Sequence, residues 1–197
     1  MLLSLLIGLT AAVLWGSWAM HGQQKLADKV VRLHILANSD SEEDQTLKLQ
    51  VRDAVLSRAE ELLTSAEGRG EAEAMLKEHL PELMILAQRT VEDKGYQYPV
   101  RAELANAVFP TREYEDFRLP AGNYLALRLV IGDGAGRNWW CVVFPPLCAQ
   151  STTDLAQTAM AAGLADDDIR LIEETDGKYV LKFKSIEILE WLRQKLL

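Results

Sequence analysis

The sequence predicts an α+β fold, with a mixed or mostly antiparallel sheet and helices packed against it. Three observations predict it. Residues 30–37 show the two-residue alternation of a strand, residues 42–95 show helical spacing, and residues 96–144 return to strand patterns. The later strands can pair as hairpins. This order is typical of a sheet with helices against it.

Length and charge bound the class of protein. The chain has 197 residues, which suggests one domain, residues 30–197, after an N-terminal segment. Its formal net charge of −8 argues against a nucleic-acid binder, which usually has a basic surface. We therefore expect no nucleic-acid partner.

The first twenty residues carry no charged side chain. Their apolar core and the small residues Ser17 and Ala19 are typical of an export signal cleaved after residue 19, although the usual basic start is missing. A retained membrane anchor is the alternative, because about 20 apolar residues can span a bilayer. Residues 20–29 are then a connector. Either reading places the domain outside the cytoplasm, with membrane contact only through an uncleaved N-terminal segment.

The first strand and the helices follow from spacing. In residues 30–37 one face is apolar, while the other is mixed and carries Arg32 and His34. The acidic run at residues 38–44 lacks the spacing of a calcium loop and is better explained by helix capping. Helices are predicted at about 42–65, at 71–79, and from Pro81 to a stop at Gly95.

The second half of the chain predicts further strands. One runs from residue 96 to 109 and ends at Pro110, before a polar connector at 111–118. Residues 124–131 and 139–144 predict a buried hairpin that turns at Asp133-Gly134. Beyond it we expect a short helix at 153–160, an acidic turn at 166–168, strands at 169–173 and 178–183, and a closing helix from Ser185.

The motifs predict no catalytic centre. Gly132, Gly134 and Gly136 follow a strand, but a strand rather than a helix comes next, so they are not a dinucleotide-binding loop. There is no nucleophile elbow and no His-Glu-x-x-His helix. We expect no catalytic residue, no cofactor and no metal site. In an exported protein Cys141 and Cys148 predict a disulfide, with two buried thiols as the alternative.

Two blocks, residues 32–55 and residues 119–148 without the intervening loop, closely resemble the stage II sporulation protein R family of endospore-forming bacteria. Residues 109–111 and 182–184 also look familial. The resemblance covers roughly residues 30–190. It implies a signalling protein, not an enzyme, that is secreted from the forespore into the space between forespore and mother cell. There it would activate a membrane-embedded aspartic protease, which processes the mother-cell pro-sigma factor.

A partner surface is predicted on physical grounds at two loops, because loops held by rigid elements often carry recognition. The residues are His34, Asn38, Asp40, Arg137, Asn138 and Trp139. The alternative for Trp139 is the core, and for Asn38 and Asp40 it is helix capping. Rival functions are an exported cell-wall hydrolase that uses His34 and an acid, and a ligand-binding or adhesion module.

Overall fold

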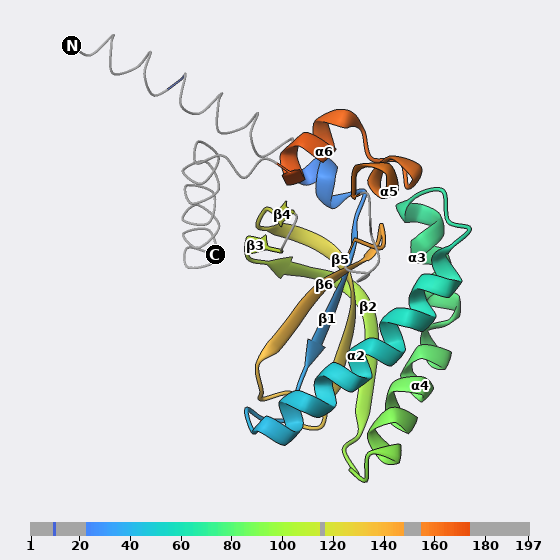
Figure 1. The fold of residues 1–197 in the computed structure, drawn as a ribbon, viewed down its shortest axis with the longest axis vertical. Coiled ribbons are helices and arrows are strands. Elements are labelled where there is room, and N and C mark those ends of the chain that lie inside the picture. The colour runs from blue at the N-terminus through green and yellow to red at the C-terminus, as the bar shows by residue number, and fades with distance from the viewer. Residues whose placement is uncertain (1–9, 11–22, 115–116, 148–154, 174–197) are drawn as a thin grey trace, which may run out of the picture.

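The computed structural model describes residues 10, 23–114, 117–147 and 155–173. Its centre is a four-stranded sheet in the order β2-β5-β1-β6 (Figure 1). The strands are β1 (Val31–Leu36), β2 (Val100–Phe109), β5 (Gly122–Ile131) and β6 (Asn138–Phe144), and a small sheet is formed by β3 (Arg112–Glu113) and β4 (Arg118–Leu119). The helices are α2 (Glu42–Leu63), α3 (Arg69–Glu78), α4 (Leu80–Asp93), α5 (Leu155–Ala161) and α6 (Asp166–Glu173).

The sheet is mixed. Strand β1 pairs in parallel with β5 and antiparallel with β6, and β2 pairs antiparallel with β5 along its whole length. The predicted α+β class, with a mixed sheet and helices against it, is therefore confirmed.

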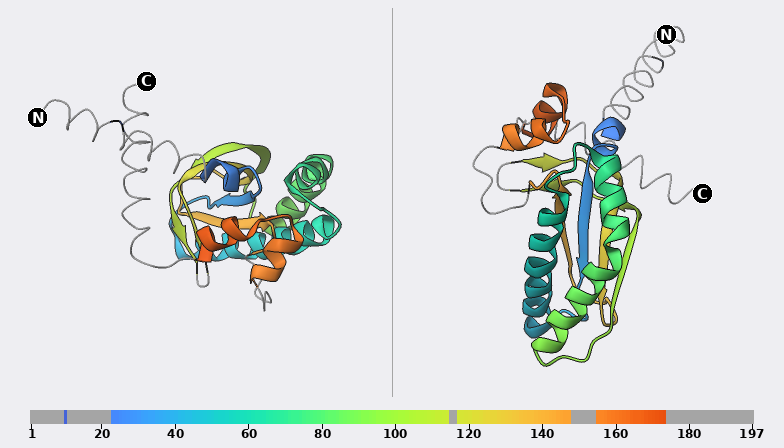
Figure 2. Two further views of the ribbon diagram at one scale, coloured as in Figure 1. Left: turned by 90° about the horizontal axis from the view of Figure 1, so that it is seen from above. Right: turned by 90° about the vertical axis from the view of Figure 1, so that its right-hand side faces the viewer.

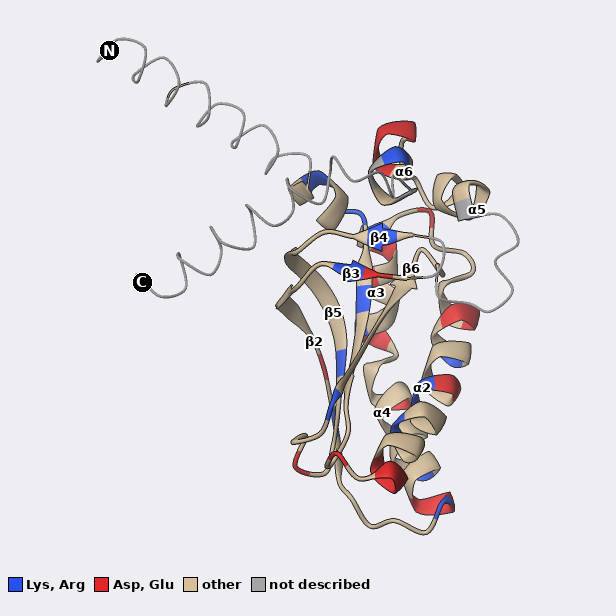
Figure 3. Cartoon of the chain, turned by 60° about the vertical axis from the view of Figure 1, so that its left-hand side comes forward, with Lys and Arg blue, Asp and Glu red and all other residues tan. Residues whose placement is uncertain are grey.

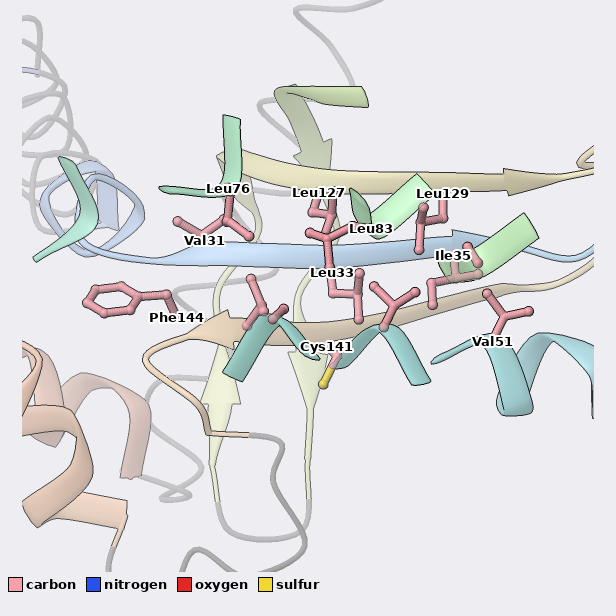
Figure 4. Packing of buried hydrophobic residues seen from close by; sticks show 14 of the residues in the cluster. Val31, Leu33, Ile35, Val51, Leu76, Leu83, Leu127, Leu129, Cys141 and Phe144 are labelled. Carbon is pink, nitrogen blue, oxygen red and sulfur yellow. The ribbon is translucent and has the colours of Figure 1, made fainter. Parts of the chain in front are cut away.

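Helices α2, α3 and α4 cover one face of the sheet (Figure 2). The alternation in β1 sends Val31, Leu33 and Ile35 to this face, and each is fully buried. Leu127 and Leu129 of β5 and Val51 of α2 belong to the same core (Figure 4). Burial of such side chains stabilises the fold by roughly 1.5–3 kcal/mol each.

The described residues cover the opposite face at the end where β1 begins. A helical turn at residues 23–27, the β3–β4 pair, α5 and α6 contribute side chains to a second core there. Its members include Leu26, Phe109, Tyr124, Val142 and Ile169. Toward the end of β1, His34 and Leu36 are only half-buried, as are Arg128 and Val130 of β5. The described helices α2, α3 and α4 pack on the other side of the sheet (Figure 3).

The helix ends follow their local chemistry. The Ser41 side chain accepts a hydrogen bond from the backbone N–H of Asp44, as an N-cap residue does. Glu42, Glu43 and Asp44 lie in the first turn, where the helix dipole favours negative charge. After α4, Gly95 has a φ of 85°, and the N–H of Tyr96 bonds to the carbonyl of Val91. The capping interpretation of the acidic run and the stop at Gly95 are confirmed.

The predicted hairpin of residues 124–131 and 139–144 is wrong. The two segments are strands, but β1 lies between them and pairs with both. Strands usually pair with their sequence neighbours, but six residues, 132–137, are enough to step over one strand, a distance of about 10 Å. Central placement pairs β1 on both edges and buries its apolar side chains.

The strand predicted at residues 169–173 is also wrong. These residues belong to α6, which begins at the acidic run interpreted as a turn. The Asp168 carboxylate accepts a hydrogen bond from the N–H of Ala165, and Ile169 and Ile172, three positions apart, are both buried. The helical spacing of the buried side chains and the acidic first turn, which the helix dipole favours, therefore explain why this segment is a helix.

Several predictions fall outside the described residues. These are the export segment apart from residue 10, the strand at 178–183, the helix from Ser185 and one cysteine, Cys148. Among the described helices, none is both long and apolar enough to cross a bilayer.

Candidate partner-binding surface

Two loops interlock at the end of the sheet where β1 finishes. The backbone N–H groups of Ala135 and Gly136 donate to the carbonyls of Asn38 and Ala37. The Asn38 side chain accepts from the N–H of Asp133 at 3.1 Å. We call residues 37–40 and 132–137 the loop junction. It fixes the β5–β6 connection to the start of α2.

Asp44, on the first turn of α2, holds the first of these two loops in place. One of its carboxylate oxygens accepts from the amide of Asn38 at 2.9 Å and from the hydroxyl of Ser39 at 2.6 Å. Burial alone would raise the pKa of Asp44, but hydrogen bonds from Ser39, Asn38 and Tyr98 outweigh it and lower the pKa. The carboxylate is therefore held ionised as an acceptor.

Glycine is required in the junction because the two backbones approach closely. A Cβ at Gly136 would overlap the carbonyl oxygen of Ser39, which is backbone and cannot move aside. Gly132 has a φ of 58°, and its Cβ would overlap the side chain of Asn38. These glycines serve loop-to-loop packing, in agreement with the rejection of a phosphate loop.

Backbone groups hold Arg137 in the junction. Its N–H donates to a carboxylate oxygen of Asp40 at 2.6 Å, and its carbonyl accepts from the Lys48 ammonium at 3.0 Å. Its guanidinium lies 3.7 Å from Asp40, and the two side chains are 71% and 65% exposed. The junction thus presents a fixed, exposed pair of opposite charges.

The half-covered sheet face begins next to this junction. Nε2 of His34 donates to Oδ1 of Asn138 at 2.8 Å, and the His34 ring stacks on Trp140 with centroids 5.7 Å apart. Arg128 lies beside His34 in the register of β1 and β5. Arg112 places its guanidinium carbon 3.6 Å from the centroid of the Trp140 ring.

Below this layer lies a fully buried arginine. Arg32 donates to the Tyr114 hydroxyl at 2.6 Å and lies against the rings of Phe109 and Tyr124 at 4.2 and 5.1 Å. Its Nε and Nη1 atoms have no hydrogen-bond partner. Burial lowers the pKa of Arg32.

The structure brings together five of the six residues predicted for a partner surface. Asn38, Asp40 and Arg137 meet in the loop junction, and His34 and Asn138 bond on the adjoining sheet face. Trp139 lies on the opposite face, where it packs against the helix-side core and Arg52 of α2 lies 4.5 Å from its ring. The core alternative fits Trp139 better.

Sequence reasoning missed Trp140, Arg128, Arg112 and Arg32 as members of this surface. The strand alternation in the sequence could have indicated them. It places Arg32 and His34 on one face of β1, and Arg128 on the same face of β5 as Tyr124. The missing information was the strand order, since only the placement of β1 between β5 and β6 makes these residues neighbours.

Within the described residues, His34 lacks the carboxylate partner that would orient a catalytic base. Burial lowers its pKa, the hydrogen bond to Asn138 opposes that shift, and the charges of Arg128 and Arg32 lower it further. No carboxylate among the described residues bonds to it, and the nearby Glu103 is paired with Arg128 at 2.7 Å. The described ranges also contain no cluster of three His, Cys, Asp or Glu side chains suited to a metal.

Cys141 lies in the helix-side core with 2% of its surface exposed. It stands on β6, and the strand ends three residues later at Phe144 (Figure 4). Its predicted partner lies outside the described residues, so the disulfide stays a prediction.

Comparison with known proteins gives one consistent result. Residues 27–154 match the family model described as Stage II sporulation protein R. A 123-residue segment is 40% identical to a Bacillus subtilis (strain 168) protein named Stage II sporulation protein R, and covers 62% of this chain and 55% of that relative. The match thus spans little more than half of the relative's length. No solved structure matches.

Proposed function

Because the chain belongs to the stage II sporulation protein R family, we propose that it activates a membrane-embedded aspartic protease that processes the mother-cell pro-sigma factor. Family membership gives the chain a role in sporulation. The protease step rests on what the family resemblance implies. In this proposal the chain is a signal and not an enzyme.

The proposed place of action is the space between forespore and mother cell. Export is supported by the uncharged, apolar residues at the start of the chain. A disulfide between Cys141 and Cys148 would suit such a compartment and close a short ring, worth about 2.5 kcal/mol by loop entropy. Mass measurement of the secreted chain after thiol alkylation, with and without reduction, checks this pairing. Two alkylated cysteines without reduction would exclude it.

Activation is proposed to work by differential binding. A protein that binds the active state of the protease more tightly than the inactive state shifts the population toward it. The observation that carries this is the loop junction, whose backbone is held by hydrogen bonds while the Asp40 and Arg137 side chains remain exposed. A preorganised surface loses little conformational entropy on binding.

The direct experiment is reconstitution. The purified chain, the protease in vesicles and the pro-sigma factor are mixed, and cleavage is followed by gel. The proposal predicts cleavage that depends on the chain and disappears when a catalytic aspartate of the protease is replaced by asparagine. Cleavage no faster than in the mixture without the chain would overturn the proposal.

A further inference from the structure

The half-covered sheet face carries three arginines and a histidine, and one carboxylate, that of Glu103, bonds to them. We call Arg32, His34, Arg112 and Arg128 the cationic cluster. The Trp140 ring connects these residues, because His34 and Arg112 both stack on it. Arg128 is the cross-strand neighbour of His34. Arg32 lies two positions before His34 on the same face of β1.

The charges of the cluster are not balanced internally. Glu103 bonds Arg128, but neither Arg32 nor Arg112 pairs with a carboxylate among the described residues. The Nε and Nη1 atoms of Arg32 and the Nε of Arg112 are buried without a hydrogen-bond partner. A buried donor without an acceptor costs about 1–3 kcal/mol, and more for a charged group.

Mutual repulsion adds to this cost. Burial lowers the pKa of both Arg32 and His34, the charge of Arg112 lowers that of Arg32 further, and the charges of Arg128 and Arg32 lower that of His34 further. An anion placed beside the guanidinium groups of Arg112 and Arg128 would relieve this repulsion. The whole chain has a net charge of −8, so this local positive charge runs against the composition.

We propose that the cationic cluster binds an acidic segment of a partner polypeptide, whose carboxylates are held by Arg112 and Arg128 beside His34 and Trp140. The planar guanidinium of arginine matches a carboxylate with two parallel hydrogen bonds. Arg32 contributes its charge from beneath without direct contact. The site is defined without reference to the protease, so it stands apart from the proposed function.

The surroundings of the cluster favour a polypeptide over a broad anionic surface. Asp40 and Asp133 are exposed at the loop end of the sheet, and Glu113 is exposed beyond Arg112 (Figure 3). A bilayer or nucleic acid spanning this end would meet these carboxylates as well as the arginines. A narrow extended segment can lie between them.

The test is a calorimetric titration of the full chain with a hexaglutamate peptide that is acetylated and amidated at its ends. We expect binding that weakens as salt is added and that hexaglutamine does not show. Replacing both cluster arginines (Arg112→Gln with Arg128→Gln) should weaken binding at least about tenfold, because charge-assisted hydrogen bonds are lost.

The matched control removes two positive charges from the helix side through Arg89→Gln with Lys94→Gln, both exposed near the end of α4. This pair should change the affinity by less than about twofold. If both double variants weaken hexaglutamate binding equally, the effect comes from net charge alone, and the proposed site is overturned. Binding of hexaglutamine as tight as hexaglutamate would do the same.

Two further measurements complete the test. Glu103→Gln frees Arg128 from its internal partner and should tighten peptide binding, which loss of folding cannot imitate. Unchanged or weaker binding in this variant would contradict the role of Arg128. Vesicles of phosphatidylglycerol should bind more weakly than the peptide, and tighter binding would assign the face to a membrane instead.

Discussion

Arg32 is a residue whose environment does not favour its charge. It is fully buried, keeps one hydrogen bond to Tyr114, and leaves two nitrogens without partners. Removing a charge from water is costly, and replacing a buried ionic group by an apolar side chain of similar size is often neutral or stabilising. Contacts with Phe109 and Tyr124 offset part of the cost.

We therefore predict that Arg32→Met changes the free energy of unfolding by no more than about 1 kcal/mol, or increases it. The same variant should weaken hexaglutamate binding, because the charge beneath the cluster is lost. Urea unfolding and calorimetry measure the two effects. A loss of stability above about 3 kcal/mol would show that Arg32 is primarily structural.

His34 predicts a dependence of stability on pH. Its folded-state pKa is lowered by burial and by the charges of Arg128 and Arg32, against the opposing hydrogen bond to Asn138. The folded state therefore binds a proton less readily than the unfolded chain, whose histidine pKa is about 6.5. This contribution to stability is fully present above that pH and is lost as the pH falls through it toward the folded-state pKa.

Thermal unfolding of the wild type and His34→Gln checks this between neutral pH and the range where carboxylates begin to titrate. The difference between the two proteins should change most near the unfolded histidine pKa, with the wild type losing more stability as the pH falls. The charged groups around the ring are Arg32, Arg128, Arg112 and Glu103. Parallel curves would contradict the prediction.

Gly136 gives the sharpest steric prediction. Gly136→Ala places a Cβ against the carbonyl oxygen of Ser39, so the two loops must separate, and we expect destabilisation of more than about 2 kcal/mol. The control is Gly70→Ala in α3, where a Cβ meets nothing and helix propensity favours alanine by up to about 1 kcal/mol. Urea unfolding of both variants compares them. Similar small effects would mean that the loop junction is not tightly packed.

At the scale of elements, β1 organises the sheet. It is the strand with β5 on one side and β6 on the other, and its apolar side chains lie in the helix-side core. We predict that its amides exchange hydrogen most slowly, while β2, with one edge unpaired in the described sheet, exchanges faster. Exchange followed by mass spectrometry on fragments checks this. Equal rates in β1 and β2 would contradict the central role of β1.

The elements were largely predictable from local patterns, whereas their pairing was not. The strand at Val31–Leu36 and the helix at Glu42–Leu63 follow from alternation and helical spacing that local side chains determine. The position of β1 between β5 and β6 depends on contacts among segments 94 to 113 residues apart. In α6, five residues were too few to distinguish a strand from a helix until the acidic first turn was considered.

The candidate site shows the same division. Asn38, Asp40 and Arg137 were chosen because each lies in a loop beside a rigid element, and the structure brings these loops together. Choosing Trp140 rather than Trp139 required knowledge of which face of β6 each residue occupies. That depends on register, because a shift of one residue exchanges the two faces. The contribution of Arg112 depends on how the β3–β4 pair folds over the sheet.

At the scale of the whole molecule, the two faces of the sheet differ in what the described residues place on them. Three helices cover one sheet face, while the other face leaves the cationic cluster half-covered next to the loop junction (Figure 2). The family match over residues 27–154 contains all four strands of the main sheet and α2 to α4. We therefore propose that partner recognition takes place at the loop junction and the adjoining face.

The most direct test of this account is the rate of pro-sigma factor cleavage in the reconstituted system with Arg137→Ala. This change leaves the backbone bonds of Arg137 to Asp40 and Lys48 in place, so the fold should be preserved. Arg89→Ala, exposed on α4, is the matched control. We predict cleavage slowed at least about tenfold by Arg137→Ala, as for loss of an interface anchor, and unchanged by the control. Full-rate cleavage with a folded Arg137→Ala protein would contradict the account.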